Sequence, residues 1–138
     1  MSLYTSVISN YMTDLDLVAY KGLYLETARQ HLSDLKNNLL QLNQSPTDQK
    51  IIYEIFRLFH SLKSQNYFMG FEKTANLCKV AENYFREIKD GARNYNSNFS
   101  HIIQDAILKI ENSLTSIEKE NKETDISSDI ISLESNLS

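Results

Sequence analysis

The sequence predicts an all-α protein built as an antiparallel four-helix bundle, with one further helix expected at each end. Proline occurs once and glycine three times in 138 residues, so few turn-forming residues interrupt the long stretches of helix formers. In four of these stretches the apolar residues recur at alternating steps of three and four, which places one apolar stripe on each helix. Four helices with such stripes can close around a shared core.

The first two helices of the bundle follow from the clearest stripes. The first stripe consists of Leu25, Ala28, Leu32, Leu35, Leu39 and Leu42. It ends before Ser45, which is expected to cap the next helix, with Pro46 in the first turn and Asp48 near the positive end. The second stripe consists of Ile52, Ile55, Phe59 and Leu62. This helix is expected to run to Tyr67 or Phe68, antiparallel to the first because the link is short.

Two more stripes predict the third and fourth helices. Gly70 is expected to separate the second helix from the third. The third stripe consists of Phe71, Thr74, Cys78, Ala81, Phe85 and Ile88. Gly91 follows as the left-handed residue that commonly stands past a helix end. After a polar stretch at residues 94–98, the fourth stripe consists of Phe99, Ile103, Ala106, Ile110, Leu114 and Ile117.

Weaker patterns predict one more helix at each end of the chain. A charged link is expected over residues 118–124, followed by a short fifth helix marked by Ile126, Ile130, Ile131, Leu133 and Leu137. Near the start, the helical spacing of Tyr4, Val7, Ile8, Tyr11, Met12 and Leu15 predicts an extra helix, either packed outside the bundle or used for dimerisation. We therefore divide the chain into an N-terminal helical extension, residues 1–19, and a bundle domain, residues 20–138.

Charge and composition argue against several classes of function. The net charge of −4 does not fit nucleic-acid binding, which needs clustered Lys and Arg. No stretch approaches the roughly twenty apolar residues that cross a bilayer, and the start lacks a secretion signal, so no membrane association is expected. The single cysteine, Cys78, excludes an internal disulfide and favours a reducing, cytoplasmic setting.

The sequence also lacks the signatures of an enzyme that holds its own cofactor. It has no glycine-rich phosphate loop, no Cys or His cluster with zinc spacing and no nucleophile elbow. We therefore expect no bound metal, no cofactor and no independent ATP site. Three histidines remain as reactive groups. His31 and His101 have no distinctive neighbours, and a solvated or structural role is expected for both.

His60 differs because it lies about 100° around the helix from the buried stripe position Phe59, so its ring should reach solvent. A neutral imidazole nitrogen is a competent nucleophile, and Lys63, three residues on, could offset the charge of a group bound to it. Glu82 of the third helix could hold the ring in its reactive tautomer if the two helices pair in that register. The same face carries Tyr53, Phe56, Arg57, Ser64 and Tyr67. On spacing alone, ordinary surface residues are the simpler interpretation.

The segment IFRLFHSLK at residues 55–63, followed by Gly70, resembles the phosphorylation-site motif of histidine-phosphotransfer domains. In that motif an aromatic and a basic residue precede the histidine, a lysine follows three positions later and a glycine ten positions later. The likeness is closest to the N-terminal phosphotransfer domain of CheA-type chemotaxis kinases. It extends over about residues 20–138 and includes much of the first helix and the stretch at 81–83.

The resemblance implies a helical bundle of this type in which His60 accepts a phosphoryl group, Lys63 stabilises its charge and Glu82 orients the ring. It implies two partners, namely the ATP-binding domain of a histidine kinase and a response-regulator receiver domain that takes the group onto an aspartate. The surface residues named above would form the docking rim, and Gly70 a structural turn. The chain would be a phosphocarrier without metal, and part of an enzyme only if a kinase core belongs to the same protein.

Three positions depart from the family pattern. Ser64 replaces the usual Gly after the lysine, Tyr67 stands where small residues are usual, and Lys79 occupies a position that is His in some members. These departures affect the expected rate and choice of partner. Two alternatives stay open. One is a free-standing phosphorelay protein with the same chemistry, which the sequence beyond Ser138 would distinguish from a kinase, and the other is a helical interaction module that is not phosphorylated because Ser64 and Tyr67 obstruct docking.

Overall fold

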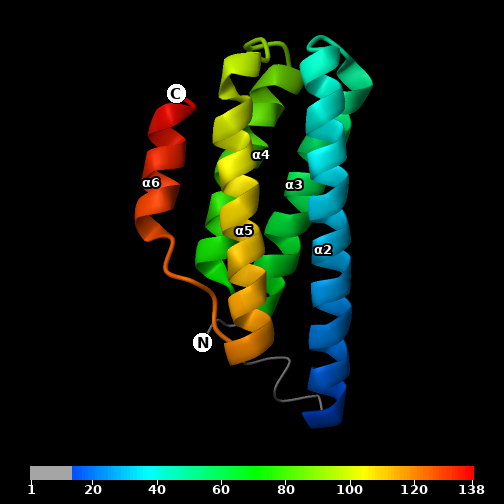
Figure 1. Ribbon diagram of the computed structural model, residues 1–138, viewed down its shortest axis with the longest axis vertical. Coiled ribbons are helices and arrows are strands. Elements are labelled where there is room, and N and C mark those ends of the chain that lie inside the picture. The colour runs from blue at the N-terminus through cyan, green and yellow to red at the C-terminus, as the bar shows by residue number, and fades with distance from the viewer. Residues whose placement is uncertain (1–13) are drawn as a thin grey trace.

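The computed structural model describes residues 14–138, and this part of the chain contains helices and no strand (Figure 1). The elements are α2 (Asp14–Gln44), α3 (Gln49–Met69), α4 (Glu72–Lys89), the 3-10 turn η1 (Ser97–Phe99), α5 (Ser100–Glu120) and α6 (Ser127–Asn136). The helix predicted from Tyr4 to Leu15 falls mainly on residues 1–13, outside the described residues. The division predicted after residue 19 lies within α2, which runs through it without a break.

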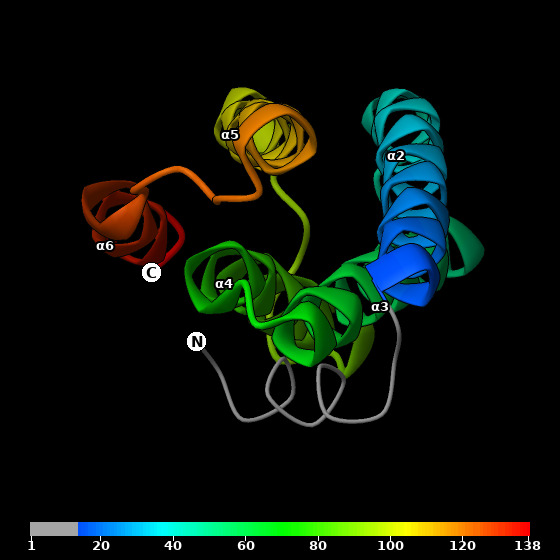
Figure 2. The same cartoon turned by 90° about the horizontal axis from the view of Figure 1, so that it is seen from below.

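Helices α2 to α5 lie side by side along the long axis, each antiparallel to the one before it (Figure 1). Seen from one end, α3 and α4 lie opposite α2 and α5, so each of these four helices contacts two neighbours (Figure 2). The C-terminal helix α6 lies outside the four, mainly against α4. The predicted all-α bundle with a fifth C-terminal helix is thus confirmed.

The predicted apolar stripes meet in the core of this bundle. The largest fully buried side chains are Leu32, Leu35, Leu39, Leu42, Ile52, Ile55, Leu58, Phe59, Leu62, Leu77, Phe85 and Ile103. Phe59 of α3 stacks on Phe85 of α4 with 6.0 Å between the ring centroids. Phe85 stacks in turn on Tyr95, which precedes α5, at 6.1 Å. These aromatic contacts fix how α3 and α4 face each other.

The start of α3 differs from the prediction that Ser45 caps it. Asp48 is the N-cap residue, because its carboxylate accepts from the backbone N–H of Lys50 at 3.0 Å and of Ile51 at 3.3 Å. Ser45 instead begins the turn before the helix, where its carbonyl accepts from the N–H of Asp48 at 3.0 Å. Pro46 lies within this turn rather than in the first turn of α3. Two otherwise free N–H groups are thereby satisfied by a carboxylate at the positive helix end.

Glycines in the left-handed region follow both α3 and α4. Gly70 has φ 85° and ends α3, which runs to Met69, slightly further than predicted. Its N–H donates to the carbonyls of Asn66 and Tyr67. Gly91 follows α4 with φ 83° and donates to the carbonyl of Ile88 at 3.1 Å. Such turns favour glycine because a side chain is strained at positive φ.

The first turn of α4 is capped by a residue that is distant in sequence. Glu123, in the link between α5 and α6, accepts from the backbone N–H of Thr74 at 2.8 Å and from its hydroxyl at 2.7 Å. The same hydroxyl lies 2.8 Å from that of Ser113 on α5. The link lies at residues 121–126 rather than the predicted 118–124, because α5 continues to Glu120 and α6 begins at Ser127. Three segments therefore meet at the start of α4.

Gly91→Ala is expected to lower the free energy of unfolding by about 1 kcal/mol, because alanine is strained at positive φ. A Cβ at Gly91 would meet nothing within 4 Å, so the cost arises in the backbone. Gly22→Ala, in the interior of α2 and equally open, is the matched control. It should raise the stability by about 0.5–1 kcal/mol. Chemical denaturation measures both, and shifts of the same sign would contradict this account.

Candidate functional site

His60 lies in α3 on a face that solvent reaches. Its side chain is 52% exposed, whereas the neighbouring Phe59 is fully buried. One turn earlier, the ring of Phe56 stacks against the imidazole, with 6.2 Å between the ring centroids and 24° between the ring planes. The imidazole is therefore supported by an aromatic neighbour while part of it remains open to water.

Glu82 of α4 contacts one nitrogen of this ring. Its side chain is fully buried, and its Oε1 atom lies 2.7 Å from Nδ1 of His60. The stacking of Phe59 on Phe85 holds α3 against α4 at this level of the bundle. The side chains of His60 and Glu82 consequently meet between the two helices, in the register that the sequence analysis required.

Three side chains with nitrogen groups surround the buried carboxylate. Besides His60, Arg86 places Nη2 2.9 Å from Oε1, and Lys63 places Nζ 2.7 Å from Oε2. Burial by itself raises the pKa of Glu82, but the contacts with Lys63 and His60 lower the pKa by more, so that it lies below its usual value. The Glu82 side chain is therefore ionised at neutral pH.

The ionised Glu82 determines which nitrogen of His60 carries a proton. A carboxylate can only accept hydrogen bonds, so Nδ1 donates to Oε1. In the neutral ring the other nitrogen, Nε2, then keeps its lone pair. The site thus presents a nucleophilic nitrogen on a half-exposed ring, with the ring proton held against a buried carboxylate.

Lys63 lies one turn beyond His60, and its side chain is only 19% exposed. The sequence analysis predicted that its ammonium group lies near a group bound to the imidazole. In the structure the ammonium pairs with Oε2 of Glu82. Lys63 therefore contributes to the charge balance of the carboxylate as well as to the positive charge beside His60.

Arg86 belongs to this site although the sequence analysis did not select it. Its spacing from Glu82 on α4 is i,i+4, which favours an ion pair and was visible in the sequence. Its Nη1 donates to the side-chain oxygen of Asn83 at 3.1 Å, and its guanidinium carbon lies 5.4 Å from the ring centroid of Phe56. The ammonium of Lys89 lies 5.0 Å from the same centroid. Phe56 is thus in contact with two cations of α4.

Tyr53, Phe56 and Arg57, which the sequence analysis placed on the rim, occupy the turns of α3 before His60. Tyr53 is 54% exposed, and its ring centroid lies 6.3 Å from that of Phe56, which is half-buried. Arg57 is exposed and forms a two-pronged contact with Glu54, with the shorter distance at 2.6 Å. An aromatic and a charged surface therefore adjoin the imidazole on this side.

Three positions depart from the family pattern. Two of them lie on the turns of α3 that follow His60, and the third lies on α4. Ser64 is exposed. Tyr67 is half-buried, and its hydroxyl donates to the side-chain oxygen of Asn76 on α4. Lys79 of α4 is exposed. The tyrosine hydroxyl is thus held toward α4.

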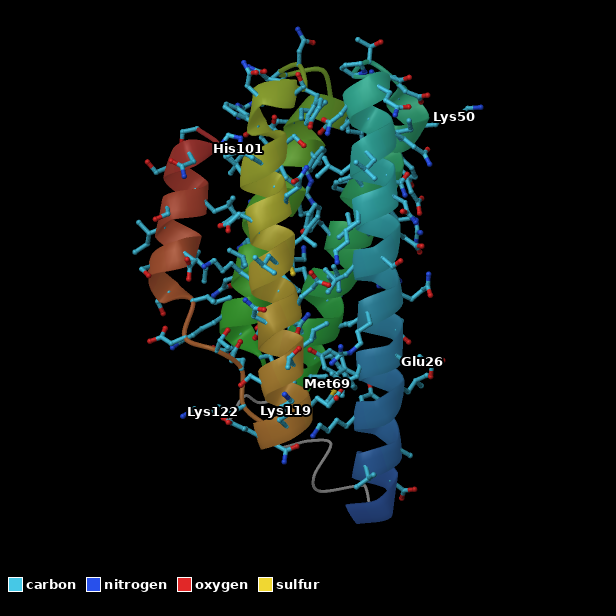
Figure 3. The ribbon with its side chains drawn as sticks, viewed as in Figure 1. Glu26, Lys50, Met69, His101, Lys119 and Lys122 are labelled. Atoms are coloured by element: carbon cyan, nitrogen blue, oxygen red, sulfur yellow. The ribbon has the colours of Figure 1, made fainter. Side chains whose placement is uncertain are left out.

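The other two histidines occupy different helices. His31 of α2 is partly buried, and its pKa is lowered mainly by burial and further by the nearby Arg57. His101 is exposed near the start of α5, on the side that faces α6 (Figure 3). Neither histidine lies on α3 or α4, the helices that bring His60 and Glu82 together.

Among residues 14–138 there are few other groups suited to chemistry. Cys78 is fully buried, and burial raises the pKa of its thiol far above the usual value. No set of His, Cys, Asp and Glu side chains in the described range could hold a metal ion. The described helices also include none with the length and apolar character needed to span a membrane.

Comparisons with known proteins identify the family of this chain. Residues 19–121 match the family model described as the Hpt domain. The chemotaxis protein CheA of Bacillus subtilis is 29% identical over 103 residues, which cover 75% of this chain and 15% of that protein. The corresponding protein of Listeria monocytogenes is 40% identical over 68 residues, 49% of this chain and 11% of that protein.

Two solved structures have the same fold. The solution structure of the histidine phosphotransfer domain of CheA superposes with a TM-score of 0.79 at 27% identity, covering 86% of this chain and 89% of that one. The CheA phosphotransferase domain from Thermotoga maritima gives a TM-score of 0.70 at 28% identity, covering 73% and 96%. The chain thus spans only 15% and 11% of the two curated relatives but corresponds to most of each isolated domain.

The lowered pKa of Glu82 makes the stability of the bundle depend on pH. Its ionised form stabilises the fold above the ordinary pKa of 4.5, and this contribution is lost as the pH falls through the lower pKa of the folded state. We expect the free energy of unfolding to decrease in that acidic range, and to decrease less in Glu82→Gln, which does not titrate there. Glu87→Gln, an exposed position on the same helix, is the control. Chemical denaturation at several pH values tests this, and an undiminished decrease in Glu82→Gln would contradict it.

Proposed function

The chain belongs to the Hpt domain family, and we propose that it is a phosphocarrier of two-component signalling whose phosphoacceptor is His60. In this proposal Nε2 of His60 attacks the γ-phosphorus of ATP held by a separate kinase domain. An N–P bond forms while the bond between that phosphorus and the ADP oxygen breaks. The phosphoryl group then passes from Nε2 to an aspartate of a response-regulator receiver domain.

The observation that supports this proposal most directly is the 2.7 Å contact between Nδ1 of His60 and the buried Oε1 of Glu82. The attacking nitrogen needs its lone pair, and a carboxylate at Nδ1 leaves that lone pair on Nε2. As the N–P bond forms, positive charge develops on the ring. A carboxylate already in place stabilises that charge without rearrangement.

Lys63 is proposed to stabilise the phosphorylated state. A phosphoryl group adds about −1.5 to −2 charges near neutral pH. Lys63 stands one turn from His60 and Arg86 touches the same carboxylate, so two cations face the single negative charge of Glu82. The excess positive charge favours a negatively charged group on the imidazole.

The residues of the rim are proposed to contact the kinase and receiver domains. Tyr53 and Phe56 provide apolar area beside the ring, and Arg57 provides a cation. Ser64 is small and exposed, which leaves room for a partner on the following turn. The bond of Tyr67 to Asn76 directs its hydroxyl toward α4, which favours an accessible imidazole over an obstructed one.

We propose that the kinase domain is that of a CheA-type histidine kinase and that the chain acts in the cytoplasm. The matching CheA proteins are several times longer than this chain, which aligns with 15% and 11% of their length. A free-standing relay protein is the alternative, with the same chemistry. The genomic sequence beyond Ser138 separates the two, since dimerisation and ATP-binding regions there would indicate a kinase. The division into residues 1–19 and 20–138 remains part of this proposal.

Incubation with the kinase core of Bacillus subtilis CheA and radiolabelled ATP tests the proposal. We expect acid-labile, base-stable label on the chain, and none on His60→Gln because the nucleophile is removed. His101→Gln, which removes an exposed histidine on α5, should keep the label. Label persisting on His60→Gln would exclude His60 as the phosphoacceptor. An unlabelled wild-type chain would favour the helical interaction module.

Glu82→Ala is expected to leave the bundle folded but to slow phosphorylation of His60. The loss should be about tenfold to a hundredfold, by analogy with the removal of a carboxylate that orients a metal-binding histidine. Glu87→Ala on the exposed side of α4 is the matched control and should keep the wild-type rate. Circular dichroism verifies the fold, and initial rates of labelling give the comparison. Equal rates in the wild type and Glu82→Ala would remove Glu82 from the mechanism.

A further inference from the structure

The Oε1 atom of Glu82 is shared by two donors. His60 Nδ1 lies at 2.7 Å and Arg86 Nη2 at 2.9 Å, while Lys63 occupies Oε2 at 2.7 Å. A carboxylate oxygen has two lone pairs, so the imidazole and the guanidinium together saturate Oε1. The contact between Glu82 and His60 is therefore made in the presence of a second, permanently charged donor on the same atom.

The guanidinium of Arg86 is held in place from three sides. Besides Oε1 of Glu82, it contacts the side-chain oxygen of Asn83 at 3.1 Å and the face of Phe56 at 5.4 Å. Phe56 also stacks on His60, so the same ring supports both groups that bind Oε1. Arginine does not lose its proton in proteins, so this contact persists at every pH at which Glu82 is ionised.

We propose that Arg86 is a positioning residue for the phosphorylation of His60, acting through Glu82. By occupying the second lone pair of Oε1, it keeps that oxygen aimed at Nδ1 and prevents the carboxylate from rotating so that Oε1 leaves Nδ1 and also turns to Lys63, which already pairs with Oε2. The ring is thereby kept as the Nδ1–H tautomer, with the lone pair on Nε2. This inference rests on the proposed function, because it names a residue that prepares the same nucleophile.

Removal of Arg86 would leave Glu82 with Lys63 as its one permanent cation. The terminal torsion of a glutamate is broad, so the carboxylate can then rotate about its last bond and move Oε1 away from Nδ1 while it keeps its pair with the ammonium. His60 would lose its acceptor part of the time, and the Nε2–H tautomer, which lacks the nucleophilic lone pair, would become populated. If the neutral ring divided evenly between the tautomers, the reactive form would fall about twofold.

Lys89 provides a matched comparison. Its ammonium also lies over Phe56, at 5.0 Å, but it pairs with Asp90 at 2.6 Å rather than with Glu82. Lys89→Gln therefore removes one positive charge from the same aromatic ring and leaves the carboxylate untouched. A difference between Arg86→Gln and Lys89→Gln isolates the contact with Oε1 from the general loss of charge.

The experiment is a ¹⁵N NMR measurement of the histidine side chains in the full chain, at mildly alkaline pH where imidazole is neutral. The wild type and Lys89→Gln should show the Nδ1–H tautomer of His60. Arg86→Gln should show a mixture of tautomers, and phosphorylation slowed about twofold if the two tautomers are equally populated. Arg86→Lys, which keeps a cation at this position, should return the ring toward the wild-type tautomer.

A wild-type spectrum in Arg86→Gln would overturn the proposal, as would an altered spectrum in Arg86→Lys equal to that of Arg86→Gln. Circular dichroism of each variant shows that the bundle is intact. The tautomer measurement requires no phosphoryl donor, so it tests the effect of Arg86 on the His60 tautomer even if His60 proves not to be phosphorylated. Failure of the proposed function would appear instead as absence of label on the wild-type chain.

Discussion

The buried carboxylate of Glu82 is the constraint on which the site depends. Placing an ion in a protein interior costs several kcal/mol unless other charges and hydrogen bonds offset it. Here the offset comes from both helices: His60 and Lys63 belong to α3, and Arg86 to α4. The lowered pKa of Glu82 means that these contacts outweigh its burial. The charge balance of this side chain therefore depends on the register of the two helices, since turning α4 by one residue would rotate the carboxylate about 100° away from His60.

The environment of the imidazole is different on its two nitrogens, and this difference is what a phosphoacceptor needs. Nδ1 faces a buried anion, whereas the side chain as a whole is half exposed and lies against Phe56. A histidine buried on all sides could not meet a partner, and one exposed on all sides would not be held in one tautomer. The position one residue after the fully buried Phe59 satisfies both conditions.

How much the sequence could predict depends on the range of each interaction. The apolar stripes depend on helical periodicity alone, so the bundle followed from spacing. The facing of His60 and Glu82 did not, because it depends on the register of two helices and was implied only by the family resemblance. The N-cap of α3 was harder to predict, because Ser45 and Asp48 are both favourable N-cap residues. The conformation of the turn between them decides which of the two caps the helix. Arg86 stood at a visible i,i+4 spacing, but a single sequence does not distinguish that pair from other surface pairs.

The capping of α4 by Glu123 was beyond prediction for a different reason, because the two partners are 49 residues apart in sequence. That contact bears on the site, since the position of Glu82 depends on the placement of α4 as a rigid unit. The first turn of α4 is held by Glu123 and, through Thr74, by Ser113 of α5. Past its other end, Arg93 donates to the carbonyl of Leu137 after α6, at 2.7 Å.

Both ends of α4 are therefore tied to segments that contribute no side chain to the cluster around His60. The aromatic contact between Phe59 and Phe85 lies midway between these two sets of hydrogen bonds, close to Glu82 in sequence. A carboxylate on a frayed or sliding helix could not remain within 2.7 Å of both a histidine and a lysine. The α5–α6 link and α6 thus support the chemistry of the site indirectly, by keeping α4 in the register that the buried charge requires.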